Sequence, residues 1–137
     1  MSEIFIFHIP SEMKYLERAC ELIARVLEGL PTTDSIKDRL ILAVNEAVTN
    51  GLIHGNKNNP SKTVTLTFRM NDSYVEIEVE DQGEGFVPQH LKLEDSAKSL
   101  HTSGRGIPIM KVCTDKVQFQ RISPRGMRVK LIKKICS

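Results

Sequence analysis

The chain has 137 residues, of which 40% are hydrophobic and 26% charged, and its formal net charge is +2. This size and apolar content predict one globular domain, residues 1–137, with a sizeable core. The small net charge gives no indication of direct nucleic-acid binding. No apolar run approaches the ~20 residues that span a bilayer and nothing resembles a signal peptide, so we expect no membrane contact and a cytoplasmic location.

Cysteines and basic residues do not indicate a special site. Cys20, Cys113 and Cys136 are widely spaced, without a pattern that holds a metal, and are expected to be reduced thiols. The segment after Asp115 has lysines and arginines but no acidic residue. We interpret it as the solvated face of a strand pair, with a polyanion site as the alternative.

The chain begins with a predicted strand and helix. "EIFIFHIP" alternates in polarity and stops at Pro10, which indicates a strand, placed at a sheet edge. Ser11 is the predicted cap of a helix that runs to about Glu28 and ends at Gly29.

A second helix is predicted from Thr33 or Asp34 to about Gly55. At 3.6 residues per turn, one arc of this helix is apolar, and it contains Leu40, Ala43, Val44, Ala47 and Gly51. Glu46 and Asn50 fall at the edge of that arc, four residues apart and therefore on the same side. Their place on the helical wheel predicts that both face the interior or the rim of a cleft. Because burying an unpaired carboxylate or amide is costly, we expect a group in that cleft to receive them.

Two alternating segments, "TVTLTFRM" and "YVEIEVED", predict a hairpin joined at "NDS". The apolar positions of the first face the core, as do Val75, Ile77 and Val79 of the second, while Glu76, Glu78 and Glu80 face water. The same alternation places Asp81 on the core side at the strand's end. A purely structural strand would not need a carboxylate there.

The remaining segments are a polar stretch, a helix and two strands. Gly104 and Gly106 precede a predicted helix from Ile107 to Val112, whose N-terminal N–H groups suit an anion. Strands follow at Val117–Arg121 and Met127–Ile132. The order β-α-α-β-β-α-β-β predicts an α+β fold with an antiparallel or mixed sheet and helices on one face.

Three features of the sequence are weak when taken singly but together resemble a known family. They are Glu46 with Asn50, Asp81 with Gly83 and Gly85, and Gly104 with Gly106. "NEAVTNGLIHGN" matches the N-box of the GHKL ATPases, a superfamily named for gyrase, a heat-shock chaperone, histidine kinases and a mismatch-repair protein. "DQGEGF" and "SGRGIPIM" match its two glycine boxes. The chain most resembles the small anti-sigma-factor serine kinases, often called RsbW-like. This resemblance implies the two-layer α/β sandwich of Bergerat type, with a mixed, mostly antiparallel sheet.

The resemblance also implies the cofactors ATP and Mg²⁺. The side-chain oxygen of Asn50 would hold the metal, a hard cation that prefers oxygen ligands. Asp81 would accept the amino group of adenine. Gly83 and Gly85 would let the backbone approach base and ribose, with Phe86 of the same box among the nucleotide contacts.

The second glycine box and the N-box supply the remaining implied roles. Gly104, Gly106 and the N–H of Ile107 resemble the cradle of the β- and γ-phosphates, and Arg105 contacts phosphate, a partner protein or solvent. Glu46 matches the general base that receives the proton of a substrate serine.

Three positions near the site need separate mention. Residues 87–103 resemble the segment that closes over the nucleotide in this family. His54 is expected to be structural. Many relatives have a threonine where this chain has Met127, which puts one polar contact to the base in doubt.

The implied function is an anti-sigma factor that binds a sigma factor and phosphorylates a serine of a small STAS-type anti-anti-sigma protein. Relatives of this kind form homodimers, and the strand Ile4–Ile9 is the expected seam. Two alternatives stay open. An ATP-binding regulatory module would sequester a partner without kinase activity, and a purely structural α/β domain would bind no nucleotide.

Overall fold

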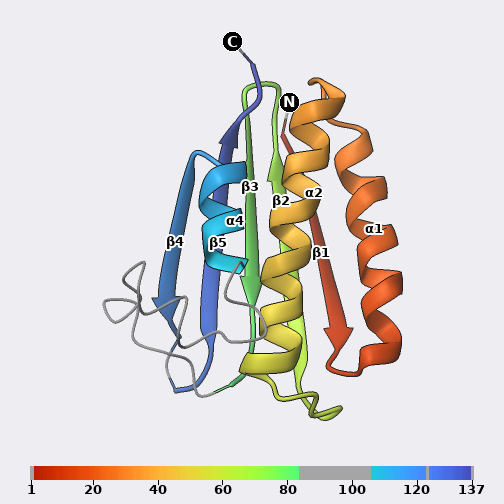
Figure 1. Cartoon of the computed structure of the whole chain (residues 1–137), viewed down its shortest axis with the longest axis vertical. Helices are drawn as coiled ribbons and strands as arrows, with labels where there is room; N and C mark the ends of the chain where they lie inside the picture. Colours follow the sequence, from red (N-terminus) through yellow and green to blue (C-terminus); the bar gives the residue numbers. More distant parts are fainter. Residues whose placement is uncertain (1, 84–105, 123, 137) are drawn as a thin grey trace.

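The computed structural model describes residues 2–83, 106–122 and 124–136, which form a five-stranded sheet with helices on one face (Figure 1). The strands are β1 (Glu3–Pro10), β2 (Thr63–Met70), β3 (Tyr74–Glu80), β4 (Lys116–Arg121) and β5 (Met127–Lys134). The helices are η1 (Met13–Tyr15), α1 (Leu16–Glu28), α2 (Asp34–Thr49), η2 (Asn50–Gly55) and α4 (Gly106–Cys113). The predicted order of elements is thereby confirmed.

The strand order across the sheet is β1-β2-β3-β5-β4, and each of these pairings is antiparallel. The chain leaves β3, passes through α4 to the far edge and returns as β5 between β3 and β4. Because β5 separates the two strands that run in the same direction, the described sheet is antiparallel rather than mixed. The predicted α+β class and the edge position of β1 are confirmed.

The core lies between the sheet and the helices. Alternating residues of β2 and β3 face it, as predicted, and their buried members are Val64, Leu66, Phe68, Met70, Val75, Ile77 and Val79. The helices supply side chains such as Ile23 and Leu27 from α1 and Leu40 and Val44 from α2. Phe68 is fully buried and its ring meets Phe7 of β1 edge to face, with centroids 6.2 Å apart.

The start of α1 differs from the prediction. Ser11 caps no helix, because a short 3₁₀ turn, η1, comes first and α1 begins only at Leu16. Ser11 is instead fully buried, and its hydroxyl accepts a hydrogen bond of 2.8 Å from Asn56 Nδ2. A buried amide requires partners, and this requirement outweighs the local capping preference of serine.

The second helix begins and ends close to the predicted residues. Thr33 caps α2, and its hydroxyl oxygen accepts from the N–H of Ile36 at 3.2 Å. At Asn50 the helix continues as a π turn, η2, which ends at Gly55. π turns inside helices are rare and occur frequently at functional sites.

The outer face of the sheet, opposite the helices, carries charged side chains of β2, β3 and β5. Arg128 Nε lies 2.6 Å from Glu80 Oε1, and Arg69 Nη1 lies 2.9 Å from Glu78 Oε1. Glu78 faces away from the core as predicted, but only 9% of it is exposed because Arg69, Arg128 and Lys130 surround it. The basic segment of β5 is thus matched by acids on the neighbouring strand.

Two kinds of feature are missing from the described ranges. No helix there combines the length and apolar character that crossing a bilayer requires. No group of three or more histidine, cysteine or acidic side chains gathers there in a way that could hold a metal.

Replacing Phe68 tests the core. Phe68→Ala should lower the free energy of unfolding by about 3–5 kcal/mol, because it removes a buried ring and leaves a cavity. Leu42→Ala is the control, since 46% of Leu42 is exposed on α2, and it should change stability by less than about 0.5 kcal/mol. Urea unfolding measures both, and equal effects would contradict this account of the core.

Candidate functional site

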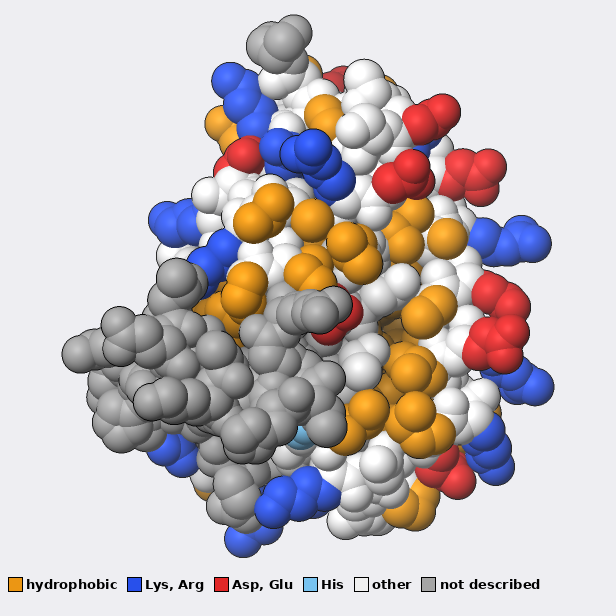
Figure 2. Space-filling model, in the orientation of Figure 1, with side chains coloured by type: hydrophobic (Ala, Val, Ile, Leu, Met, Phe, Trp, Pro, Cys, Tyr) orange, Lys and Arg blue, Asp and Glu red, His pale blue; other side chains and the backbone are white. Residues whose placement is uncertain are grey.

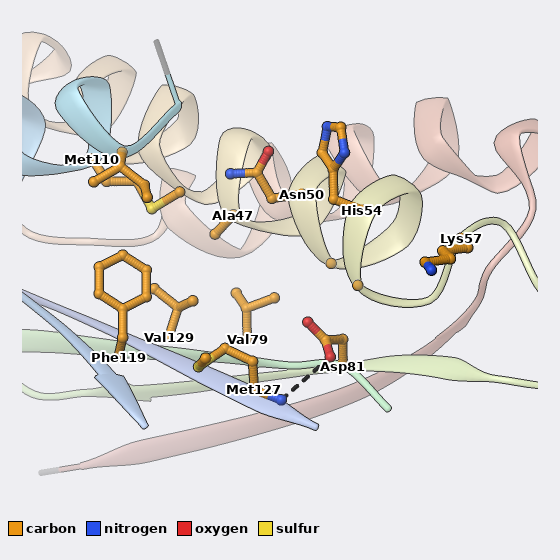
Figure 3. A pocket seen from close by; sticks show the side chains of 13 residues that line it. Ala47, Asn50, His54, Lys57, Val79, Asp81, Met110, Phe119, Met127 and Val129 are labelled. Carbon is orange, nitrogen blue, oxygen red and sulfur yellow. Dashed lines mark hydrogen bonds between the residues drawn. The ribbon is translucent and has the colours of Figure 1, made fainter. Parts of the chain in front are cut away.

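A cavity of about 200 Å³ lies between the sheet and the helix layer (Figure 3). The helices contribute Asn50 and Met110 from above, and the sheet contributes Asp81, Phe119 and Met127 from below. Most lining side chains are apolar, and a few polar groups reach inward. This composition is typical of small-molecule sites.

Asn50 is positioned by the change from α-helix to π turn. Its Oδ1 is buried, and no described residue donates a hydrogen bond to it. A buried amide oxygen without a partner is costly, so such an atom suggests a missing ligand. Asn45 Oδ1 shares this property, but Asn45 is not among the residues lining the cavity.

The N-terminus of α4 meets Glu46 and Asn50. A methyl group at Gly106 would lie 2.9 Å from Asn50 Nδ2 and 3.3 Å from Glu46 Oε2. The glycine therefore allows the start of α4 to approach both side chains. Two of the motifs found in the sequence come together here, and the backbone N–H groups of a helix start lie beside the cavity.

Asp81 stands at the end of β3 on the core side, as predicted, and lines the cavity. Its Oδ1 accepts hydrogen bonds from the N–H of Gly83 at 2.9 Å and of Met127 at 3.2 Å. Burial raises the pKa of the Asp81 carboxyl, while these two N–H groups and the charge of Lys62 oppose the rise.

Glycines allow the turn after β3 to sit against the end of η2. A methyl group on Gly83 would lie 1.9 Å from the carbonyl oxygen of Gly55, and one on Gly55 would lie 2.3 Å from Asp81 Oδ2. No side chain fits at either position without moving the backbone or the carboxylate. Gly83 is thus required by close packing beside Asp81.

Met127 occupies the position where a threonine was expected from the family. Its side chain is buried and lines the cavity, while its backbone N–H binds Asp81. Gly126, just before it, has a φ of +124°, and a methyl group there would lie 2.4 Å from the carbonyl oxygen of Asp81. The turn before β5 therefore holds Asp81 through backbone atoms, which does not depend on the residue type at position 127.

The structure brings Asn50, Asp81 and Ile107 to the cavity, with Glu46 next to it at Gly106. Other predicted site residues lie outside the described ranges, and these are Gly85, Phe86, Gly104, Arg105 and the segment 87–103. His54 is exposed where it lines the cavity.

Sequence reasoning missed several lining residues. Met110 and Phe119 lie within a predicted helix and a predicted strand, but helical periodicity and alternation do not distinguish a core position from a cavity wall. Lys57 follows the predicted end of the second helix, and it lines the cavity with a left-handed backbone, φ 52°. Asn58 repeats this conformation, with φ 55°. The turn-forming letters "GNKNN" were the only indication.

Known proteins resemble this chain over most of its length. Residues 9–133 match the family model described as a histidine kinase-like ATPase domain. A relative named anti-sigma F factor, from Clostridium botulinum strain Eklund 17B, is 35% identical over 107 residues, covering 76% of this chain and 74% of the relative.

Two further relatives have the same name. The one from Geobacillus stearothermophilus is 34% identical over 113 residues, covering 77% of this chain and 74% of the relative. The one from Clostridium acetobutylicum is 32% identical over 133 residues, covering 90% and 92%. The chain therefore belongs to the histidine kinase-like ATPase family, the GHKL type that its three motifs indicated.

Proposed function

We propose that this cavity binds Mg-ATP and that the chain is an anti-sigma factor with protein serine kinase activity. The strongest support for the nucleotide site is that two acceptor oxygens, Asn50 Oδ1 and Asp81 Oδ2, border one cavity. No described residue donates a hydrogen bond to Asn50 Oδ1, and the hydrogen bonds to the Asp81 carboxylate from Gly83 and Met127 go to its Oδ1. The family match adds that domains of this kind are ATPases.

Asp81 would recognise adenine. Because Oδ1 is held by the N–H groups of Gly83 and Met127, Oδ2 is left for the amino group of the base. Apolar side chains such as Val79 and Met127 would pack against the ring. Gly85 and Phe86 would complete the base and ribose contacts.

The phosphates would lie toward α4. Gly104, Arg105, Gly106 and Ile107 would surround the phosphates, since the N-terminal N–H groups of a helix attract anions. Asn50 Oδ1 fits Mg²⁺, which prefers oxygen ligands, and the bound ion would neutralise charge on the phosphate oxygens.

Glu46 is the proposed general base. It would take the proton of a substrate serine while the serine oxygen bonds to the γ-phosphorus and the bond to the leaving ADP breaks. Its carboxylate lies beside Gly106, at the helix start that would cradle the phosphates. This position suits a group that acts on a nucleophile next to the γ-phosphate.

The proposed partners are a sigma factor and a small STAS-type antagonist, in the cytoplasm. The relatives are named anti-sigma F factors. On the helix-covered face, apolar side chains gather along the middle of the molecule and most charged ones lie toward its rim (Figure 2). Leu42 of α2 and Val112 of α4 are exposed there at 46% and 74%. Phosphorylation would add about two negative charges to the antagonist and disfavour its complex.

A regulatory module that binds ATP and sequesters a partner without kinase activity is the second candidate. It needs Asn50, Asp81 and the glycines but gives Glu46 no chemical role. The position of the Glu46 carboxylate beside Gly106 favours the kinase.

Asp81→Asn tests the nucleotide site. It should weaken ATP binding at least about tenfold, because an amide is a poorer acceptor for the base. It should also raise the melting temperature of the ligand-free protein at pH 7. Burial raises the pKa of Asp81 in the folded protein above its value in the unfolded chain, about 3.9. The contribution of Asp81 to the free energy of unfolding therefore falls as the pH rises through the interval between these two pKa values, and it stays lower above the folded pKa.

Calorimetry measures both effects of Asp81→Asn. The gain in melting temperature should shrink toward pH 4 and below, where Asp81 itself becomes protonated. Unchanged ATP binding would remove Asp81 from the proposed site. A loss of stability at pH 7 would contradict the conclusion that burial has the largest effect on the pKa of Asp81.

Glu46→Gln separates kinase from sequestering module. It should keep ATP affinity within about threefold, and it should slow phosphate transfer about 100-fold or more, the range for loss of a general base. The measurement is transfer from γ-labelled ATP with Mg²⁺ to serine in the small single-domain proteins encoded nearby. Nucleotide binding without transfer by the wild type would favour the sequestering module.

The homodimer is a further part of the proposal, with β1 as its seam. β1 is an edge strand, and Ile4 and Ile6 on its outer side are 60% and 57% exposed. Ile6→Lys should shift a dimer to monomer in sedimentation, because charge on an edge opposes pairing. Leu42→Lys, on α2, is the control and should leave the assembly state unchanged. A dimer that survives Ile6→Lys would place the seam elsewhere.

A further inference from the structure

Asn56 forms a buried polar cluster next to Gly55, which lines the cavity. Only 1% of the residue is exposed, and its Nδ2 donates to Ser11 Oγ at 2.8 Å and to the carbonyl oxygen of Thr63 at 3.0 Å. Its Oδ1 accepts from the N–H of Gln82 at 2.7 Å. Both amide hydrogens and the oxygen are thus in use, so the amide cannot rotate without losing bonds.

The bond to Gln82 fixes the turn that carries Asp81. Gln82 lies between Asp81 and Gly83, whose N–H donates to Asp81 Oδ1. The Gln82 side chain is tied as well, since its Oε1 accepts from the N–H of Thr63 at 2.7 Å. With Gly83 packed against the carbonyl oxygen of Gly55, the backbone that follows Asp81 rests on the end of η2.

We propose that Asn56 is a positioning residue for purine selectivity, because its bond to the N–H of Gln82 fixes the backbone that leads into Gly83, so that Asp81 directs Oδ2 at the base. The proposal deepens the nucleotide site proposed above and rests on it. Asn56 is not among the residues lining the cavity, so it would act through Asp81 and not by touching the ligand.

The expected consequence is specific to the base. If Gln82 and Gly83 move, Asp81 Oδ1 loses the Gly83 N–H and keeps only that of Met127. The carboxylate can then turn about this one bond, so that an amino group at purine C6 is no longer preferred over a carbonyl oxygen. Contacts of the phosphates with α4 and Asn50 should remain. If Asn56→Ala affected folding alone, the apparent affinity for every nucleotide would fall by the same factor, which is the fraction of protein that is folded.

The test compares ADP with IDP, which has a carbonyl oxygen in place of the adenine amino group and, like ADP, cannot donate a γ-phosphate. Calorimetric affinities of both are measured with Mg²⁺ for the wild type and for Asn56→Ala. The preference for ADP should fall about tenfold in the variant, the size expected for misplacing one charged acceptor. Amide proton exchange at Gln82 and Gly83 should lose protection in the same variant.

Ser11→Ala is the matched control. It removes one bond of Asn56 on the side away from Gln82, so it should reduce stability while leaving the ADP preference within about twofold of the wild type. If Asn56→Ala does not fold, Asn56→Ser, which is too short to reach Gln82, takes its place. An unchanged preference in a folded variant at position 56 overturns the proposal. If the wild type binds neither nucleotide, the proposed function itself fails.

Discussion

The packing of the turn after β3 against the end of η2 is the constraint on which the site depends. Asp81 directly follows β3 with its carboxylate on the core side, and two backbone N–H groups hold one of its oxygens. Gly55 and Gly83 permit this arrangement because neither position has room for a side chain. Burial disfavours the charged form of the Asp81 carboxylate. The folded protein would therefore be more stable with a neutral side chain at this position, yet it has a charged acceptor there.

The helix layer brings polar groups to the buried cavity from residues that remain in helical segments. The change from α2 to the π turn η2 begins at Asn50, and the next helix to pack there, α4, begins at Gly106. A glycine at that helix start admits the Asn50 and Glu46 side chains. The start of a helix, an amide oxygen and a carboxylate therefore converge, and together they suit a metal-bound phosphate better than any of them would alone.

The two faces of the sheet have different tasks. The helix-covered face builds the core and the cavity, while the outer face carries pairs such as Arg128 with Glu80. Exposed pairs of this kind add little to stability, and they keep an open sheet face from being apolar. The edge strand β1 differs, since Ile4 and Ile6 leave it apolar on the outer side. A self-associating seam would explain that difference.

The sequence by itself determined the elements and the orientation of the key side chains. Period-2 alternation in β2 and β3 and the 3.6-residue period of α2 report which side is apolar, so Asp81, Glu46 and Asn50 could be recognised as polar groups on the wrong side. Tertiary structure alone decided the rest. Ser11 binds the buried amide of Asn56 and does not cap a helix as predicted. Strand β5 lies between β3 and β4. Phe119 lies in the wall of the cavity. These three features depend on contacts between residues that are far apart in the chain, and the periodicity of a single strand or helix carries no information about such contacts.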